Sequence, residues 1–300
     1  MYTQRTQETK DKYLDIMHSM VNLYYTETGR EWSLDPTLMA HWLGKRKGDL
    51  SLYTWRVYRA SMRYVIEEQK PELLGKVLEI LDFYGVTETS KTTKVPRLKH
   101  ISESTWDKII EVYLNSQSMW LGLGLIVIQA GIITGLRPGE WAKSRMDGDT
   151  LIVRNSKHTN GRAFDEFRHL NLSTLNDEQK KIIQYVVSFA SSKSAAEWKS
   201  TLDSCRQSIH YAAKKANVPG FTLYSARHQA VSNARKSKLS DEAIAAMLGH
   251  ASVLTSKKHY GTSGGGHAQD GFVTPSESDV SKVQHIMDSK TDQASHDEYI

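Results

Sequence analysis

The most apolar stretch of this 300-residue chain runs from Trp120 to Ile133, and it constrains the fold more than any other segment. Gln129 and several glycines interrupt it, and its 14 residues are fewer than the roughly 18 of a membrane span. It therefore predicts a buried core helix, with Gly135 as its C-cap. Residues 1–5 lack the apolar core of a signal peptide.

Hydrophobic periodicity predicts four helices in the first 84 residues, which we interpret as a small all-α N-terminal domain. The expected helices are 11–26, 35–45, 51–69 and 72–84. Residues 85–100 are polar, basic and poor in hydrophobic side chains, so they predict an interdomain linker that could clamp a duplex.

Residues 101–262 predict a second domain in which helices accompany a small antiparallel sheet. The sheet is expected from strand patterns at 150–154 and 164–172, joined by a turn-rich hairpin loop at 155–162. Further helices are expected at 176–192, 195–216, 225–238 and 241–248. The predicted fold class is mainly α: an all-α domain followed by an α+β domain.

Residues 263–300 predict a flexible hinge and an acidic tail. Thr274 and Glu277 form a capping box with Pro275 as the first helical residue, which predicts a short amphipathic helix at about 274–288. Such a helix needs a groove in its own molecule or in a neighbour, and docking in its own molecule is the commoner arrangement.

Charge is divided unevenly along the chain. Residues 261–300 hold seven acids and two bases, so the net charge of +5 for the whole chain leaves +10 on residues 1–260. That excess suits nucleic acid, although solubility alone could explain it. The only cysteine, Cys205, cannot form an internal disulfide, which favours a reducing cytoplasm.

Two arginines lie at helix boundaries. Arg137 falls in the turn between Gly135 and Pro138, where Glu140 and Trp141 can buttress it. Arg227 falls in the first turn of a helix beginning near Ser225, where the helix dipole already favours an anion. A guanidinium there suits two oxygens of one phosphate.

Three further side chains could complete an active site. Lys157 lies on the hairpin loop, although exposed hairpin lysines usually do nothing specific. His250 follows the helix-stopping pair Leu248-Gly249, where a lone histidine is more often structural. Tyr260 follows Lys257-Lys258-His259, and forming its phenolate at pH 7 would cost roughly 4 kcal/mol unless neighbouring groups help.

Taken in order, these motifs resemble those of the tyrosine recombinase (phage integrase) family. They are TGLRPGE around Arg137, the Ser156-Lys157 hairpin, YSARH around Arg227, LGH ending at His250, and the tyrosine of KKHYG. The resemblance covers residues 101 to about 262 by motif and the N-terminal segment by layout. It implies that 101–262 is a catalytic domain and that 1–84 is a DNA-binding domain for the core site. One departure is Tyr224, where the family usually has histidine; His228 matches a histidine that often follows the second arginine.

The resemblance implies a site-specific DNA recombinase that needs neither metal nor ATP. Tyr260 would attack a phosphodiester to give a 3′-phosphotyrosyl intermediate, Arg137, Arg227 and His250 would stabilise the transition state, and Lys157 would protonate the leaving 5′ oxygen. The family works as a tetramer on two sites, which implies exchange of the 274–288 helix between protomers. Little chain precedes the first helix, which favours a simple recombinase from a mobile element or a resolution system.

DNA contacts outside the catalytic set are expected on the third helix and the linker. Arg56, Arg59 and Arg63 form one stripe of the helix, although arginines on an exposed face are often merely solvated. The linker candidates are Lys94, Arg97 and Lys99. Two alternatives stay open: a type IB topoisomerase-like activity, and a non-catalytic DNA-binding regulator, for which Tyr224 is the only hint.

Overall fold

The structure is a computed structural model that describes residues 5–86, 88–90, 96–156, 158, 163–255, 265–267 and 271–283. The chain divides into two compact units, Met1–Lys94 and Val95–Ile300. No helix in the described ranges combines the length and the hydrophobicity that crossing a membrane would require.

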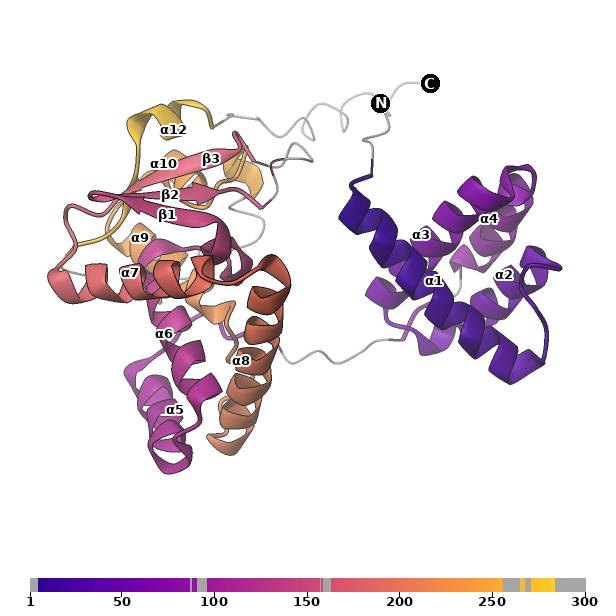
Figure 1. The fold of residues 1–300 in the computed structure, drawn as a ribbon, viewed down its shortest axis with the longest axis horizontal. Helices are drawn as coiled ribbons and strands as arrows, with labels where there is room; N and C mark the ends of the chain where they lie inside the picture. Colours follow the sequence, from indigo (N-terminus) through magenta and orange to yellow (C-terminus); the bar gives the residue numbers. More distant parts are fainter. Residues whose placement is uncertain are drawn as a thin grey trace, which may run out of the picture. The chain divides into compact units, whose positions relative to one another are not determined.

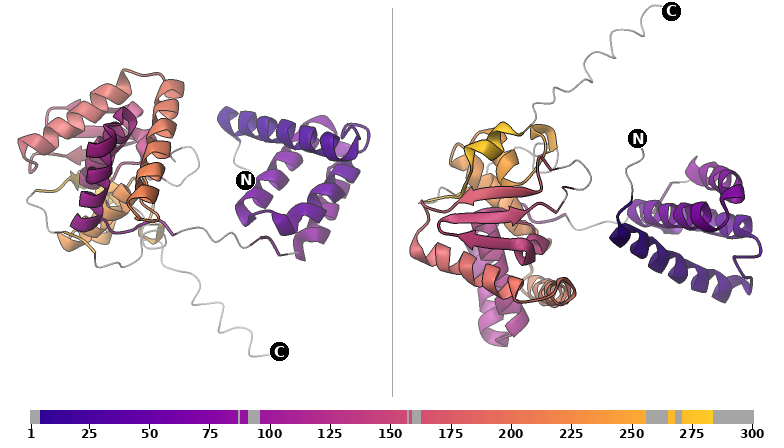
Figure 2. Two further views of the ribbon diagram at one scale, coloured as in Figure 1. Left: turned by 90° about the horizontal axis from the view of Figure 1, so that it is seen from below. Right: turned by 45° about the horizontal axis from the view of Figure 1, so that its top comes forward.

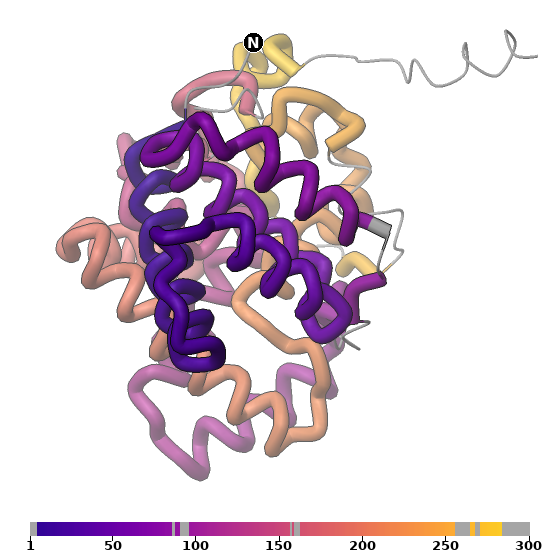
Figure 3. Tube along the Cα trace, turned by 90° about the vertical axis from the view of Figure 1, so that its right-hand side faces the viewer, coloured from indigo at the N-terminus to yellow at the C-terminus, as the bar shows by residue number. Residues whose placement is uncertain are grey.

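The first unit consists of four α-helices, which Figure 3 shows facing the viewer. They are α1 (Gln7–Thr28), α2 (Pro36–Lys45), α3 (Leu52–Gln69) and α4 (Leu74–Phe83), with 3-10 turns η1 (Arg46–Asp49), η2 (Pro71–Leu73) and η3 (Tyr84–Val86). Thr6, Asp35 and Ser51 accept backbone hydrogen bonds at the first turns of α1, α2 and α3, as N-caps do. These are the four helices that the periodicity predicts.

Helix α1 packs on α3, and α2 packs on α4, around a core rich in methionine. Met17, Met20, Met39 and Met62 are all buried in it. Lys47 is buried and binds the turn η3. Its Nζ donates to the carbonyl oxygen of Tyr84 at 2.8 Å and to that of Gly85 at 2.6 Å.

The second unit is built around one apolar helix. Helix α6 contacts α7, α8 and α9 and ends at Gly135 with φ +71°, which confirms the predicted core helix and its glycine cap. The elements in chain order are α5 (Glu103–Ser116), α6 (Met119–Thr134), η4 (Pro138–Lys143), β1 (Ser144–Asp147), β2 (Thr150–Arg154), β3 (Phe167–Asn171), α7 (Asp177–Ser191), α8 (Ala195–Lys215), α9 (Ser225–Lys236), α10 (Asp241–Met247), β4 (Thr274–Pro275) and α12 (Glu277–Ser281).

The strands form one antiparallel sheet in the order β1-β2-β3-β4. Figure 2 shows the three longer strands side by side, and Figure 1 shows α7 beside β1 and α10 near β3. The sequence predicts β2 and β3 but not β1, because only Ser144 of its four residues is buried and the strand lacks an apolar alternation.

The predicted start of the C-terminal helix is wrong. Thr274 and Pro275 form strand β4, paired with β3, and the helix begins after Ser276, whose side chain caps it. Proline is compatible with an edge strand, where one missing N–H costs little. The apolar Val280 and Val283 pack against α10 of the same chain, so this segment docks in its own molecule. Residues 284–288 of the predicted helix lie outside the described residues.

Cys205 should report on the packing of the second unit. It is fully buried on α8, facing α6 at Gly124, and burial raises the pKa of its thiol to about 11. Because the thiolate is the reactive form, we expect a thiol reagent to leave Cys205 unmodified in the native protein and to label it after unfolding. The control is Lys199→Cys, at an exposed position on the same helix, and its new thiol should react at once in the native protein. Equally rapid labelling of Cys205 in the native protein would contradict its burial between α8 and α6.

Candidate active site

Arg137 is held where the sequence predicts, in the turn between α6 and η4. Its backbone N–H donates to Glu140 Oε2 at 2.9 Å, and its Nη1 donates to Glu140 Oε1 at 2.7 Å. The side chain of Arg137 is 15% exposed, whereas that of Glu140 is fully buried. The turn thus presents one partly exposed guanidinium, fixed by a buried carboxylate from the next turn.

Glu140 also binds a second arginine that the sequence did not single out. Arg168 on β3 is completely buried and donates from Nη2 to Glu140 Oε2 at 2.8 Å. Burial would raise the pKa of Glu140, but the positive charges of Arg168, Arg137 and Arg227, with the hydrogen bond from Arg168, lower it far below its usual range. The carboxylate is therefore charged at neutral pH.

Arg227 is completely buried at the first turn of α9. Its Nη1 donates to the carbonyl of Gly135 at 2.6 Å, and its Nη2 donates to the carbonyl of Leu248 at 2.9 Å. The same Nη2 lies 3.1 Å from Nε2 of His250. Because a guanidinium can only donate, His250 accepts through Nε2. The predicted arginine and histidine are thus in direct contact.

The turn that carries His250 requires glycine before it. Gly249 has φ +68°, and a Cβ there would lie 2.1 Å from Oδ1 of Asn155. Asn155 is buried at the start of the hairpin loop and accepts a hydrogen bond from Arg168. Asn155 and Arg168 therefore join the hairpin to the His250 turn.

The hairpin backbone is anchored on both sides of position 157. The N–H and the Oγ of Ser156 lie 3.4 Å and 3.1 Å from Glu140 Oε1, as donors to it. On the other side, Nδ1 of His158 lies 2.7 Å from the carbonyl oxygen of Asn155. Lys157 itself lies outside the described residues. Its neighbours contact the group formed by Glu140, Arg137, Arg168, Arg227, His250 and Asn155, which we call the Glu140 cluster: Ser156 contacts Glu140, and His158 contacts Asn155.

Tyr224 is the N-cap residue of α9, one turn before Arg227. Its ring lies under the guanidinium of Arg97, whose Cζ is 4.9 Å from the ring centroid. His228 is half-buried, one residue after Arg227. The structure thus places Tyr224 and His228 around the same helix start as Arg227.

The remaining predicted residues divide between the two units. Tyr260 and Lys94 lie outside the described residues. Arg97 and Lys99 are exposed at the start of the second unit. The stripe on α3 of the first unit faces outward in part: Arg56 is exposed, Arg59 is half-buried and forms an ion pair with Asp82, and Arg63 is half-buried.

Asn155 and Arg168 are the site residues that sequence reasoning missed. A signal for Arg168 exists, because it shares a strand face with Leu170, two residues away and buried in the core. A charged side chain on an apolar strand face requires a buried partner. That partner, Glu140, could not be identified from the sequence, since 28 positions separate the two.

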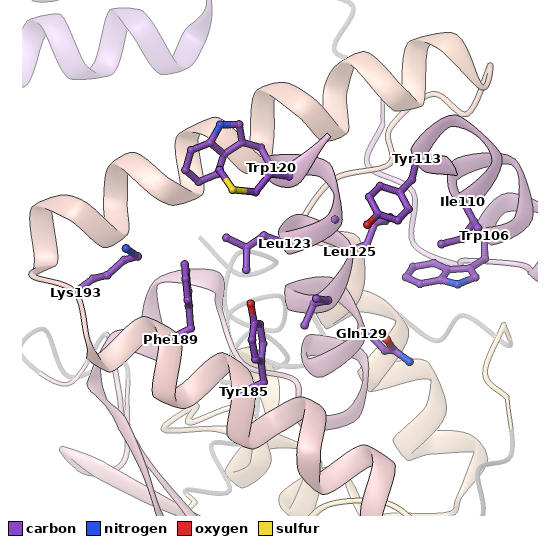
Figure 4. Close-up of a pocket in the computed structure, with 13 residues that line it drawn as sticks. Trp106, Ile110, Tyr113, Trp120, Leu123, Leu125, Gln129, Tyr185, Phe189 and Lys193 are labelled. Atoms are coloured by element: carbon purple, nitrogen blue, oxygen red, sulfur yellow. The ribbon is translucent and has the colours of Figure 1, made fainter. Parts of the chain in front are cut away.

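A hollow of about 720 Å³ lies elsewhere, among α5, α6 and α7. Figure 4 shows aromatic side chains around it, including Trp120, Tyr185 and Phe189, with Lys193 at one side. None of its described lining residues belongs to the predicted catalytic set. The predicted catalytic residues that the structure describes lie instead around Glu140, where charged side chains meet. In the ranges that the structure describes, no three His, Cys, Asp or Glu side chains are grouped as metal ligands would be.

Comparisons with known proteins identify the fold. No protein-family model and no curated protein matches the chain. Among solved structures, a lambda integrase tetramer bound to a Holliday junction is similar, with a TM-score of 0.50 and 13% identity over 90% of this chain and 75% of that chain. A lambda integrase dimer bound to a COC′ core site has a TM-score of 0.43 and 14% identity, over 81% of this chain and 94% of that one. The first likeness shows that the chain has the fold of lambda integrase, a tyrosine recombinase, and confirms the predicted fold class.

Glu140 is expected to stabilise the fold as well as the site. Replacing it in Glu140→Gln leaves Arg168 buried beside a neutral amide, which should lower the free energy of unfolding by about 3–5 kcal/mol at pH 7. Glu166→Gln is the matched control, because its ion pair with Arg154 is exposed and should contribute at most about 1 kcal/mol. Urea unfolding measures the loss of unfolding free energy in both variants. Equal losses would contradict a larger stabilising contribution from Glu140 than from Glu166.

The difference between wild type and Glu140→Gln should also depend on pH. The pKa of Glu140 is lower in the folded protein than its usual value, so its stabilising effect is present at neutral pH and is lost as the pH falls toward the lowered value. We expect the gap in unfolding free energy to narrow below about pH 4. A gap that widens on acidification would refute the assigned direction.

Proposed function

We propose that this chain is a site-specific DNA recombinase that breaks and rejoins strands through a covalent tyrosyl intermediate. The carrying observation concerns three predicted catalytic residues: Arg137 and Arg227 lie against one buried carboxylate, Glu140, and His250 lies against Arg227. The lambda integrase fold supports DNA breakage and rejoining as the general class of activity. The single thiol, buried and reduced, is consistent with a cytoplasmic enzyme.

The proposed reaction conserves phosphodiester energy. In the first step the hydroxyl of Tyr260 loses its proton to solvent and its oxygen forms a bond to phosphorus, while the bond from phosphorus to the 5′ oxygen breaks and the ammonium of Lys157 gives that oxygen a proton. In the second step the 5′-hydroxyl of a partner strand returns a proton to Lys157 as its oxygen attacks the phosphotyrosine, and the departing oxygen of Tyr260 takes a proton back from solvent. Because no high-energy bond is consumed, the cycle requires no nucleotide.

The arginines would bind the non-bridging oxygens of the phosphate. Arg137 is partly exposed, so it can receive a phosphate directly. Arg227 is fully buried, so a phosphate reaches it only when the groups covering it move. Once bound, each arginine would stabilise the pentacovalent transition state, and removing either should cost on the order of 10²–10³ in rate. Tyr224 and His228 would add hydrogen bonds beside Arg227.

The first unit and the linker would bind duplex DNA at the core site. Arg56 on the outer face of α3, with Arg59 and Arg63 on the same stripe, suits a phosphate backbone. Lys94, Arg97 and Lys99 would contact the duplex from the linker. Arginine and lysine contacts of this kind give affinity rather than base recognition.

Tyr260→Phe tests the chemistry. A supercoiled or nicked suicide substrate from the genomic neighbourhood, incubated without metal or nucleotide, should give a protein–DNA adduct on a denaturing gel with the wild type and none with the variant. Tyr211→Phe, an exposed tyrosine on α8, is the control that should form the adduct normally.

The same experiment distinguishes the second candidate, a non-catalytic DNA-binding regulator, which Tyr224 favours because it cannot carry the positive charge of a histidine. Tight binding of that DNA with no adduct from the wild type would support the regulator. An adduct that relaxes supercoils without joining partner strands would instead indicate topoisomerase-like activity.

The working unit is proposed to be a tetramer on two DNA sites that exchanges its C-terminal segment between protomers. In the structure, the buried carboxylate of Asp279 accepts from the backbone N–H of His169 at 2.6 Å in the same chain. Exchange would form this contact with a neighbour instead, after β4 has left β3.

Asp279→Ala is therefore expected to abolish tetramers on paired DNA sites while leaving adduct formation on a suicide substrate within about threefold. Glu277→Ala, exposed on the same helix, should leave assembly intact. Analytical ultracentrifugation with DNA measures the assembly, and unchanged tetramers in Asp279→Ala would argue against the exchange.

A further inference from the structure

We propose that Arg97 and Tyr224 together form a second phosphate-binding site, in which Arg97 supplies the positive charge that Tyr224 lacks. The ligand would be a backbone phosphate of the duplex, next to the turn that carries Arg227. This inference rests on the proposed function for its ligand, and it assigns Arg97 to the reaction rather than to general duplex binding.

The backbone on both sides of Arg97 is fixed to the second unit. The N–H of Leu98 donates to the carbonyl of Gly220 at 2.9 Å. Gly220 has φ +81°, and a Cβ there would lie 2.1 Å from the carbonyl oxygen of Pro96. The linker therefore approaches this turn too closely for any other residue. Gly220 lies four residues before Tyr224, so the same turn positions both partners of the stacked pair.

Arg97 and Tyr224 line a cavity of about 230 Å³ with Thr222 and with Arg206 and His210 of α8. Arg206 already has a carboxylate partner, Asp203. Arg97 is exposed and forms no ion pair within the described part of the chain. Its charge is therefore available to an anion at the mouth of this cavity.

The stacked geometry suits a phosphate. A guanidinium lying over an aromatic ring keeps its N–H edge open for two oxygens of one phosphate. The hydroxyl of Tyr224 can donate a further hydrogen bond but contributes no charge. Tyr224 is the N-cap residue of α9, so the positive end of that helix dipole adds to the potential beside the stacked pair.

Removing Arg97 should therefore slow strand cleavage itself and not only weaken DNA binding. At saturating suicide DNA, we expect Arg97→Ala to lower the single-turnover rate of adduct formation by about tenfold or more. The matched control is Lys215→Ala, which removes another exposed cation lying over a tyrosine, with Nζ 5.9 Å from the ring centroid of Tyr211. That variant should react at the wild-type rate.

A double-mutant cycle with Tyr224→His decides whether Arg97 acts at this position. Histidine can carry its own positive charge, so in the Tyr224→His background the loss from Arg97→Ala should fall below about threefold. The rate of Tyr224→His should also acquire a dependence on pH near the histidine range, about pH 6 to 7. Equal losses in both backgrounds, or a wild-type cleavage rate in Arg97→Ala, would overturn the proposal.

Failure of the proposed function is distinguishable from failure of this site. A wild type that forms no adduct contradicts the recombinase, and the site is then judged by equilibrium binding of the same duplex. There Arg97→Ala should reduce the slope of log affinity against log salt by about one, and Lys215→Ala should not change it. Identical slopes for all three proteins would refute the phosphate site independently of catalysis.

Discussion

The second unit depends on the hydrogen bonds and ion pairs of one buried carboxylate, that of Glu140. It accepts hydrogen bonds from Arg137 and Arg168 and from Ser156 of the hairpin, and its Oε2 lies 3.9 Å from Nη1 of Arg227. Three guanidinium groups packed together would repel one another in a low-dielectric interior, and one negative charge among them removes much of that cost. The carboxylate thus makes it possible for three guanidinium groups to lie close together in the interior.

The cluster also couples segments that are far apart in the chain. Arg227 binds carbonyls at the end of α6 and at the end of α10, while Arg168 links the sheet to the hairpin through Asn155. The glycine before His250 allows that turn to approach Asn155. Arg137, Arg227 and His250 are therefore each positioned by contacts from at least one other element.

This chain is similar to lambda integrase in fold but has little sequence identity with it. At 13% identity the chain has the fold of lambda integrase, and neither a family model nor a curated protein matches it. The short motifs TGLRPGE and LGH lie at turns, where Gly135 and Gly249 both have positive φ. Core positions, in contrast, accept many combinations of hydrophobic residues of suitable size.

Periodicity and capping in the sequence were enough to predict the four helices of the first unit, the core helix α6, the hairpin strands and the turn positions of Arg137, Arg227 and His250. These features depend on local preferences, which neighbours in the chain determine. The strand β1, the strand at Thr274 and Pro275, and the identity of the partner of Arg168 depended on contacts with distant segments, which no local pattern specifies. The same holds for the stacking of Arg97 on Tyr224. Only the tertiary structure decides such contacts, because burying a charge or closing a sheet edge is favourable only when a partner from elsewhere in the chain is present.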